Sequence, residues 1–211
     1  MKVLVAGANG QVGQHVVRLL AEAGHEARAM IRDEAQSSKL EDLGGEPVVA
    51  DLEDEVAYTV EGCDAIIFSA GGGPGSGPEK KKSIDLGGAV KLIVAAQDRG
   101  VRRFVMVSAI GASNPELGSE RMQPYLFAKA QADEALRESG LDYTIVRPGS
   151  LTNEEGSGMI EAAHSLGRRG EIPREDVART LVETLTPHNT FGKTFEVLSG
   201  DTPIEEAVAN L

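Results

Sequence analysis

The chain has 211 residues, with 33 acidic side chains against 21 lysines and arginines, and a formal net charge of −12. This excess of negative charge argues against nucleic-acid partners and anionic membranes, because both need clustered basic residues. With 41% hydrophobic and 26% charged residues, the composition is that of a globular protein. Its core must be aliphatic, since aromatic residues make up only 4%.

The chain contains one cysteine, Cys63, so it cannot form an intramolecular disulfide, which fits a reducing compartment. No stretch is apolar over the roughly 18 residues that a membrane helix needs, and the sequence opens on a strand rather than a signal peptide. We therefore expect a cytoplasmic protein. The four histidines share no metal-ligand spacing with carboxylates or Cys63, so we expect no metal site.

The N-terminal stretch MKVLVAGANGQVG predicts a strand, a glycine-rich turn and the start of a helix. Gly7 permits a tight turn, Gly10 lets a pyrophosphate approach the backbone, and Gly13 lets the helix pack closely on the strand. The N–H groups and the positive dipole end of helix 11–23 then face the phosphates. The predicted dinucleotide site comprises Gly7, Asn9, Gly10, Gln11 and Val12.

Strands and helices alternate along the rest of the chain. Strands are expected at 27–31, 47–50, 65–69, 104–107, 143–146 and 193–198. Helices are expected at 34–44, 53–61, 83–99, 125–139, 174–186 and 203–210, with a short helix at 159–166 in an otherwise irregular segment. The alternation predicts an α/β protein with a doubly wound parallel sheet. Without a repeat or linker, residues 1–211 are expected to form a single domain.

Arg32 ends the second predicted strand, where this fold places the group that contacts the adenosine ribose. An arginine suits a 2′-phosphate through charge-assisted hydrogen bonds, which favours NADP over NAD. The neighbouring Asp33 is the competing candidate, because an acidic residue would bond a free 2′-hydroxyl. A solvated charge at the strand end is the alternative role for Arg32.

Two later strand ends supply further cofactor candidates. Asp51 and Leu52 are expected beside the adenine, with a plain turn as the alternative. Ser69, Ala70 and Gly71 open a glycine-rich segment and are expected to line the cofactor, because ligands collect at the carboxyl ends of parallel strands. Residues 73–82 are expected to form a mobile loop.

Three side chains suggest chemistry. Ser108 follows a strand, and Tyr125 and Lys129 are four positions apart on one helix face. Free tyrosine has a pKa of about 10, and a nearby ammonium stabilises the phenolate, so the pair predicts a general acid/base at neutral pH. Lys129 can also hold a ribose hydroxyl, and Ser108 can orient a substrate oxygen. An ordinary helix with a buried tyrosine and an exposed lysine is the alternative.

Four motifs, GANGQVG, VSA at 107–109, YLFAK at 125–129 and RPG at 147–149, together resemble the short-chain dehydrogenase/reductase superfamily. The glycine pattern and the RPG resemble its extended and atypical branches, which include NAD(P)-binding, epimerase-like and NmrA-like proteins. The resemblance implies a Rossmann sheet of about seven strands in the order 3-2-1-4-5-6-7, with helices on both faces. It also implies catalytic roles for Ser108, Tyr125 and Lys129, and adds Pro148 to the cofactor candidates.

The chain departs from that family in two ways. Asp85 lies in the region where the family has a catalytic asparagine, and a carboxylate cannot donate as an amide does unless it is protonated. A carboxylate that stabilises a helix N-terminus is the alternative. The region after Pro148 is short, so the substrate site is expected to be small and limited to residues around 109–124 and 150–173.

Two functions follow as expectations. The first is an NADP(H)-binding oxidoreductase or epimerase-like enzyme for a small carbonyl or hydroxyl compound, with Tyr125, Lys129, Ser108 and Asp85 as the catalytic candidates. The second is a non-catalytic NADP(H)-sensing protein that acts through a protein partner. The sequence leaves open a homodimer formed through helices 83–99 and 125–139.

Overall fold

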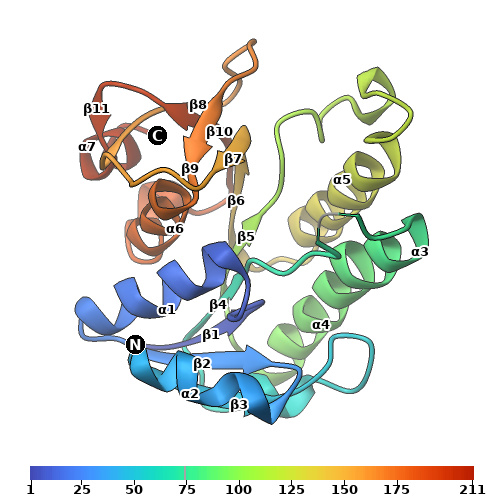
Figure 1. Cartoon of the computed structure of the whole chain (residues 1–211), viewed down its shortest axis with the longest axis vertical. Coiled ribbons are helices and arrows are strands. Elements are labelled where there is room, and N and C mark those ends of the chain that lie inside the picture. The colour runs from blue at the N-terminus through green and yellow to red at the C-terminus, as the bar shows by residue number, and fades with distance from the viewer. Residues whose placement is uncertain (74) are drawn as a thin grey trace.

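A large sheet forms the centre of the computed structural model, which describes residues 1–73 and 75–211 (Figure 1). In this part of the chain, nine strands join in the spatial order β11-β8-β10-β6-β5-β4-β1-β2-β3. They are β1 Lys2–Ala6, β2 Glu26–Ile31, β3 Gly45–Val49, β4 Ala65–Phe68, β5 Arg103–Val107, β6 Asp142–Pro148, β8 Met159–Ala163, β10 Lys193–Ser199 and β11 Thr202–Pro203. A separate two-stranded parallel sheet pairs β7 (Ser150–Thr152) with β9 (Glu171–Pro173).

The strands from β3 to β10 pair in parallel, in the order β3-β2-β1-β4-β5-β6-β10. This is the order predicted for a Rossmann sheet, with β10 as the seventh parallel strand, so the expected fold class is confirmed. Beyond β10, the strands β8 and β11 continue the sheet in antiparallel pairing. The edge strands are therefore β3 on one side and β11 on the other.

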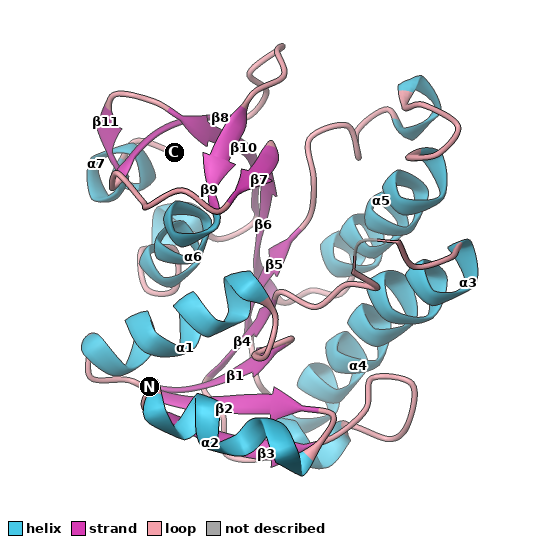
Figure 2. Ribbon diagram, in the orientation of Figure 1, coloured by secondary structure: helices cyan, strands magenta, loops and turns pink. Residues whose placement is uncertain are grey.

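Helices cover both faces of the sheet (Figure 2). One face is covered by α1 Gln11–Glu22, α2 Ser37–Asp42, α6 Arg174–Glu183 and α7 Ile204–Ala209, and the other by α4 Ala89–Arg99 and α5 Gln123–Glu138. Because successive side chains of a strand point to opposite faces, Val3 and Val5 pack in the core with α1, whereas Leu4 and Ala6 pack in the core with α4. Both cores are aliphatic, as the composition predicts.

Helical structure begins earlier than expected on the α4 side. The α3 helix spans Pro78–Lys81, a π-helical segment η3 spans Lys82–Gly88, and α4 follows directly. The prediction of a loop over 73–82 is therefore wrong from Pro78 onward, where a proline at the first helical position favours a helix start. Pro74, which belongs to that predicted loop, lies outside the described residues.

The remaining corrections concern short elements. The helix expected at 159–166 is wrong, because Met159–Ala163 forms β8 and pairs with β10. The helix expected at 53–61 is reduced to the 3-10 turn η2, Ala57–Val60. Short 3-10 turns also occur at η1 Glu34–Gln36, η4 Pro115–Leu117 and η5 His188–Thr190.

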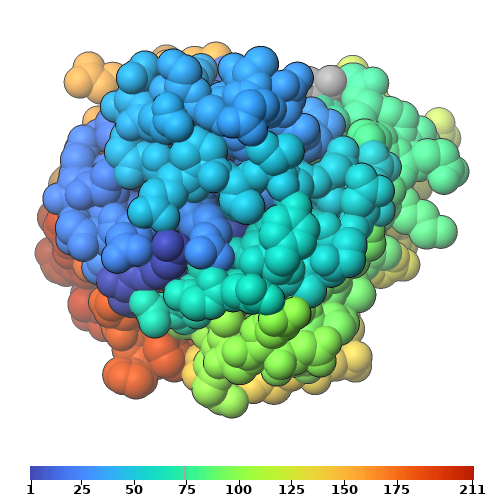
Figure 3. Space-filling view, turned by 90° about the horizontal axis from the view of Figure 1, so that it is seen from below, coloured from blue at the N-terminus to red at the C-terminus, as the bar shows by residue number. Residues whose placement is uncertain are grey.

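Seen from below, the molecule presents N-terminal segments coloured blue to teal, with orange C-terminal atoms at the margin (Figure 3).

Arg103, at the start of β5, connects the residues directly after α6 to the sheet through hydrogen bonds. Its guanidinium is 5% exposed and donates to the carbonyl oxygens of Leu185, Asp142 and Thr184 and to the hydroxyls of Thr144 and Thr190. Among the described residues it forms no ion pair with a carboxylate, and burial lowers the pKa of Arg103 to about 10. The carbonyl oxygens at the C-terminus of α6 provide the compensating negative potential.

We expect Arg103→Met to lower the free energy of unfolding by about 3 kcal/mol, because several buried carbonyl groups lose their donor. Urea unfolding followed by circular dichroism measures the change. Arg102→Met is the matched control: Arg102 is exposed and its ion pair with Asp142 is solvated, so little change is expected. Equal destabilisation by both substitutions would contradict the role given to Arg103.

Candidate functional site

The turn between β1 and α1 packs directly on the backbone that follows β4. Gly7 has a φ of +84°, and a Cβ atom there would lie 2.7 Å from the Cα and N atoms of Ala70. At Gly13, a Cβ atom would lie 2.1 Å from the carbonyl oxygen of Gly7. Glycine at these two positions allows the strand, the turn and the helix to come this close.

The first turn of α1 presents backbone N–H groups that suit an anion. Gly10 precedes the helix without a side-chain cap, and the first turn carries no acidic side chain. Gly10 and Gln11 are exposed, so a ligand can reach this backbone. The carbonyl oxygen of Asn9 accepts a 2.7 Å hydrogen bond from Gln14, which holds the turn in place. An uncapped helix N-terminus behind a glycine turn fits the diphosphate of a dinucleotide.

The other cofactor candidates lie at the carboxyl ends of the parallel strands, at the same end of the sheet as this turn. Arg32 follows β2, Asp51 and Leu52 follow β3, Ser69 to Gly71 follow β4, and Pro148 ends β6. In such sheets, ligands bind at this end, beside the place where the strand order reverses between β1 and β4. The structure therefore places these residues along one end of the sheet, and their individual contacts with a cofactor remain predictions.

Some of these groups have partners within the protein. The Asp51 carboxylate accepts a 2.9 Å hydrogen bond from the N–H of Glu53 and so stabilises the turn after β3. The hydroxyl of Ser69 donates to the carbonyl oxygen of Ala6 at 3.0 Å. Leu52 is buried. These contacts give Asp51 and Ser69 structural roles at the site.

Arg32 and Asp33 differ in what their side chains contact. The Asp33 carboxylate accepts a 2.9 Å hydrogen bond from the N–H of Ala35 and caps η1. The Arg32 side chain is exposed and makes no ion pair among the described residues. The Asp33 carboxylate thus accepts a hydrogen bond from its own turn, whereas the guanidinium of Arg32 is available to a ligand at the end of β2.

Lys129 is the buried cation of the site. Its ammonium donates a 3.0 Å hydrogen bond to the carbonyl oxygen of Val107, the last residue of β5, and lies 3.1 Å from Asp85 Oδ1. It also lies 5.8 Å from the centre of the Tyr125 ring. Burial lowers the pKa of Lys129, but the neighbouring Tyr125 and Asp85 raise it more, so the net pKa is raised and the ammonium stays charged. The alternative of an exposed lysine is wrong.

Tyr125 differs from the expectation in the direction of its pKa. Burial raises the pKa of Tyr125, the charge of Lys129 lowers it, and the carboxylates of Asp85 and Asp133 raise it further. The net pKa of Tyr125 is raised, so the charge of Lys129 does not bring this pKa down to neutral pH. A tyrosine with a raised pKa is protonated at neutral pH and can donate a proton.

Ser108 is 1% exposed and donates a 3.0 Å hydrogen bond to Asp133 Oδ2. The same oxygen accepts hydrogen bonds from Arg147 Nε at 3.0 Å and Nη2 at 2.7 Å, while Arg147 Nη1 donates to the hydroxyl of Ser113 at 2.6 Å. Burial raises the pKa of Asp133, against the effect of Arg147. Ser108 thus belongs to the Ser108–Asp133–Arg147–Ser113 network rather than standing free beside Tyr125. The first three members of this network are buried, and Ser113 is exposed.

The sequence prediction missed Asp133, Arg147 and Ser113 as members of the site. A signal existed for Asp133, which follows Lys129 by four positions and therefore lies on the same helix face as Tyr125. Arg147 belongs to the RPG motif, of which only Pro148 was a candidate. Ser113 lies in the irregular segment after β5, where spacing carries no information.

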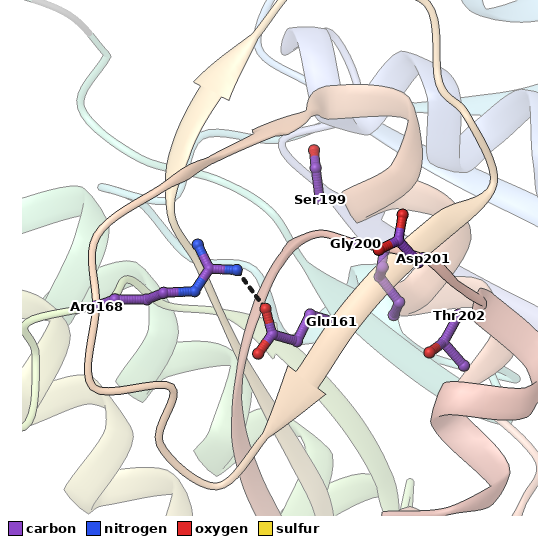
Figure 4. A pocket seen from close by; sticks show the side chains of 7 residues that line it. Glu161, Arg168, Ser199, Gly200, Asp201 and Thr202 are labelled. Carbon is purple, nitrogen blue, oxygen red and sulfur yellow. Dashed lines mark hydrogen bonds and ion pairs between the residues drawn. The ribbon is translucent and has the colours of Figure 1, made fainter.

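The described surface has two hollows, of which one adjoins the candidate site. One, of about 420 Å³, is lined by Gln11, Gln14 and His15 of α1, by residues 152–155 and by Arg174 and Glu175, so it adjoins the predicted diphosphate site. The other, of about 520 Å³, lies near β8 and β11, where Arg168 pairs with Glu161 (Figure 4). None of the predicted catalytic or cofactor-binding residues lines the second hollow, although Ile160, Glu161 and Arg168 belong to the segment 150–173 that was predicted for the substrate site.

Residues 7–188 match the NAD(P)H-binding family, and the chain belongs to that family. It is 48% identical, over 100% of both proteins, to the uncharacterized sugar epimerase YhfK of Bacillus subtilis. It resembles a Bacillus halodurans structure provisionally named as an NAD-dependent epimerase/dehydratase, with 45% identity, full coverage of both chains and a TM-score of 0.98. The oxidoreductase ylbE of Lactococcus lactis is 32% identical over 100% of this chain and 96% of that one, with a TM-score of 0.89.

These relationships confirm the predicted resemblance to NAD(P)-binding, epimerase-like proteins and do not distinguish NADP from NAD. Within residues 1–73 and 75–211, no helix has both the length and the apolar character needed to cross a bilayer. The same residues contain no group of three or more histidine, cysteine, aspartate or glutamate side chains that could hold a metal ion.

The glycine turn gives a prediction that separates folding from binding. Gly13→Ala places its Cβ atom against backbone atoms and should destabilise the fold by about 1–3 kcal/mol. Gly10→Ala meets only a 3.1 Å approach to the Gly7 carbonyl oxygen, so it should fold, yet lose about tenfold or more in NADPH affinity. Urea unfolding and fluorescence titration with NADPH measure the two effects. Unchanged affinity in folded Gly10→Ala would exclude the diphosphate site.

Proposed function

We propose that this protein is an NADP(H)-dependent oxidoreductase of the short-chain dehydrogenase/reductase type, or a related epimerase-type enzyme, acting on a small carbonyl or hydroxyl compound. One observation carries the proposal. Tyr125 lies beside the buried Lys129 ammonium, which is anchored at the carboxyl end of β5, the end of the sheet that also carries the glycine turn. The family of NAD(P)H-binding proteins supplies the cofactor class.

Some of these residues would bind the cofactor, and others would take part in proton transfer. Gly7 to Val12 would hold the diphosphate, and Arg32 would bond the 2′-phosphate of NADP. Lys129 donates to the carbonyl oxygen of Val107 and is paired with Asp85, so at least one of its three N–H donors is left for a ribose hydroxyl. When bound, NADPH supplies a hydride to a carbonyl carbon. Tyr125, protonated at neutral pH, would then give its proton to the oxygen, and Lys129 would stabilise the resulting phenolate.

A second candidate is a non-catalytic NADP(H)-sensing protein that acts through a protein partner. It is favoured by the hydrogen bond from Ser108 to Asp133, because this bond withdraws the hydroxyl that would orient a substrate. Asp85 in place of an amide points the same way. Saturable NADPH binding without turnover on any carbonyl compound would support this candidate over the enzyme.

Tyr125→Phe tests the enzymatic proposal. With a panel of small carbonyl compounds and NADPH, we expect turnover to fall by about 10²–10⁴-fold, the usual contribution of a general acid, while NADPH affinity is unchanged. The measurement is the loss of NADPH absorbance at 340 nm. Tyr143→Phe is the control, because Tyr143 lies near the start of β6, at the opposite end of the sheet from the site. Equal turnover in wild type and Tyr125→Phe would remove Tyr125 from the mechanism.

Arg32→Ala tests the choice of cofactor. It should weaken NADP binding more than NAD binding, by about 1–3 kcal/mol for the loss of hydrogen bonds to a charged phosphate. Isothermal titration with both nucleotides measures the difference. Asp33→Ala serves as the matched variant, and a selective loss of NAD affinity in that variant would favour the ribose role for Asp33. If Arg32→Ala weakens both nucleotides equally, the 2′-phosphate assignment is wrong.

A further inference from the structure

Asp85 is a buried carboxylate to which the proposed reaction assigns no step. It lies in the π-helical segment η3 and is 1% exposed. Its Oδ1 atom lies 3.1 Å from the Lys129 ammonium, and its Oδ2 atom accepts a 2.9 Å hydrogen bond from the N–H of Gly72. A Cβ atom on Gly71 would lie 2.9 Å from Oδ1, so glycine there leaves room for the carboxylate. One side chain thus joins η3, α5 and the segment after β4.

The ion pair with Lys129 affects Tyr125 because all three groups share a poorly solvated space. The Lys129 ammonium is 5.8 Å from the centre of the Tyr125 ring, and charges act strongly over such distances away from water. A carboxylate 3.1 Å from the same ammonium offsets much of its field. The geometry therefore reduces the stabilisation that Lys129 alone would give to a phenolate.

Other charged groups also face Tyr125. The ammonium of Lys81, in α3, lies 5.9 Å from the ring centre, and Lys81 is only partly buried, so water screens its charge. Asp133 lies further along α5 and is paired with Arg147. Asp85 is paired with Lys129, the α5 cation that donates to β5 and lies beside the tyrosine ring. Asp85 is therefore the carboxylate best placed to offset the charge that acts on Tyr125.

We infer that Asp85 is a positioning residue that balances the charge of Lys129, so that Tyr125 keeps its proton at neutral pH and acts as a proton donor. The consequence, which rests on the proposed function, is that at neutral pH the site is in the protonation state that reduction needs, whereas oxidation needs a higher pH. In reduction, a hydride adds to the carbonyl carbon, the phenol O–H bond breaks, its proton joins the carbonyl oxygen, and the phenolate regains a proton from water. In oxidation the phenolate must form first, and Asp85 opposes its formation.

Titration of Tyr125 by NMR tests this inference without cofactor or substrate. The chain has three tyrosines and no tryptophan, so tyrosine labelled with ¹³C at Cζ gives few signals, and Tyr125→Phe assigns the relevant one. We expect Asp85→Asn to lower the pKa of Tyr125 by about one unit relative to wild type. Glu134→Gln, which removes an exposed acid from the same helix, should leave it unchanged. An unchanged pKa in folded Asp85→Asn would overturn the inference.

A second comparison covers the case in which Asp85→Asn does not fold because it leaves Lys129 unpaired. Lys129→Gln should raise the pKa of Tyr125, since Asp85 then acts unopposed. The double variant Asp85→Asn with Lys129→Gln contains neither charge and should titrate below Lys129→Gln alone. Equal values for these two variants would overturn the inference as firmly as the first comparison.

Activity separates this inference from the proposed function. If carbonyl compounds are reduced, the pH at which the reverse oxidation becomes measurable should fall by about one unit in Asp85→Asn, in parallel with the NMR titration. If the pKa of Tyr125 shifts as expected but no variant or wild type turns over any substrate, the charge balance stands and the proposed reaction fails.

Discussion

A buried ammonium needs compensating partners, and the position of Lys129 between the end of β5 and the η3 segment is the constraint on which the candidate site depends. The carbonyl oxygen of Val107 and the carboxylate of Asp85 supply these partners. Because Asp85 also holds Gly72, the same charge fixes the start of the glycine-rich segment after β4. The backbone of that segment in turn contacts Gly7 in the first turn. The groups proposed for proton transfer and for cofactor binding therefore share one set of contacts.

The second buried charge pair explains why the serine does not stand alone. Asp133 and Arg147 neutralise each other across α5 and β6, while Ser108 donates to Asp133 and Ser113 accepts from Arg147. Such a network is costly to break in part, since removing one member leaves the others unpaired in the interior. It joins the end of β5 to the segment after it, which is the segment where the substrate site was predicted. The network would therefore hold the first part of that segment against α5 and β6.

Local pattern was enough to predict the fold but not the partners of the polar side chains. The run Val3 to Ala6, the glycine turn and the stripe of α1 each specify one structure, and the structure contains them as predicted. The segment Met159–Ala163 contains helix-forming residues, yet it forms β8 because pairing with β10 outweighs propensity. The helix spacing indicated Tyr125 and Lys129, whereas the pairing of Asp85 with Lys129 depends on the packing of distant segments. Charge balance, and with it the pKa of Tyr125, could not be predicted from spacing.

The two strands that border the main sheet share a chemical property. Pro47 lies within β3, and Pro203 lies within β11, so each border strand lacks one backbone N–H donor. A further strand from another molecule would have to pair with a ladder interrupted at that point, which proteins use to prevent uncontrolled strand addition. Association through a continuous intermolecular sheet is thus disfavoured at both borders. Self-assembly of this protein would then rest on contacts between side chains rather than on a shared sheet.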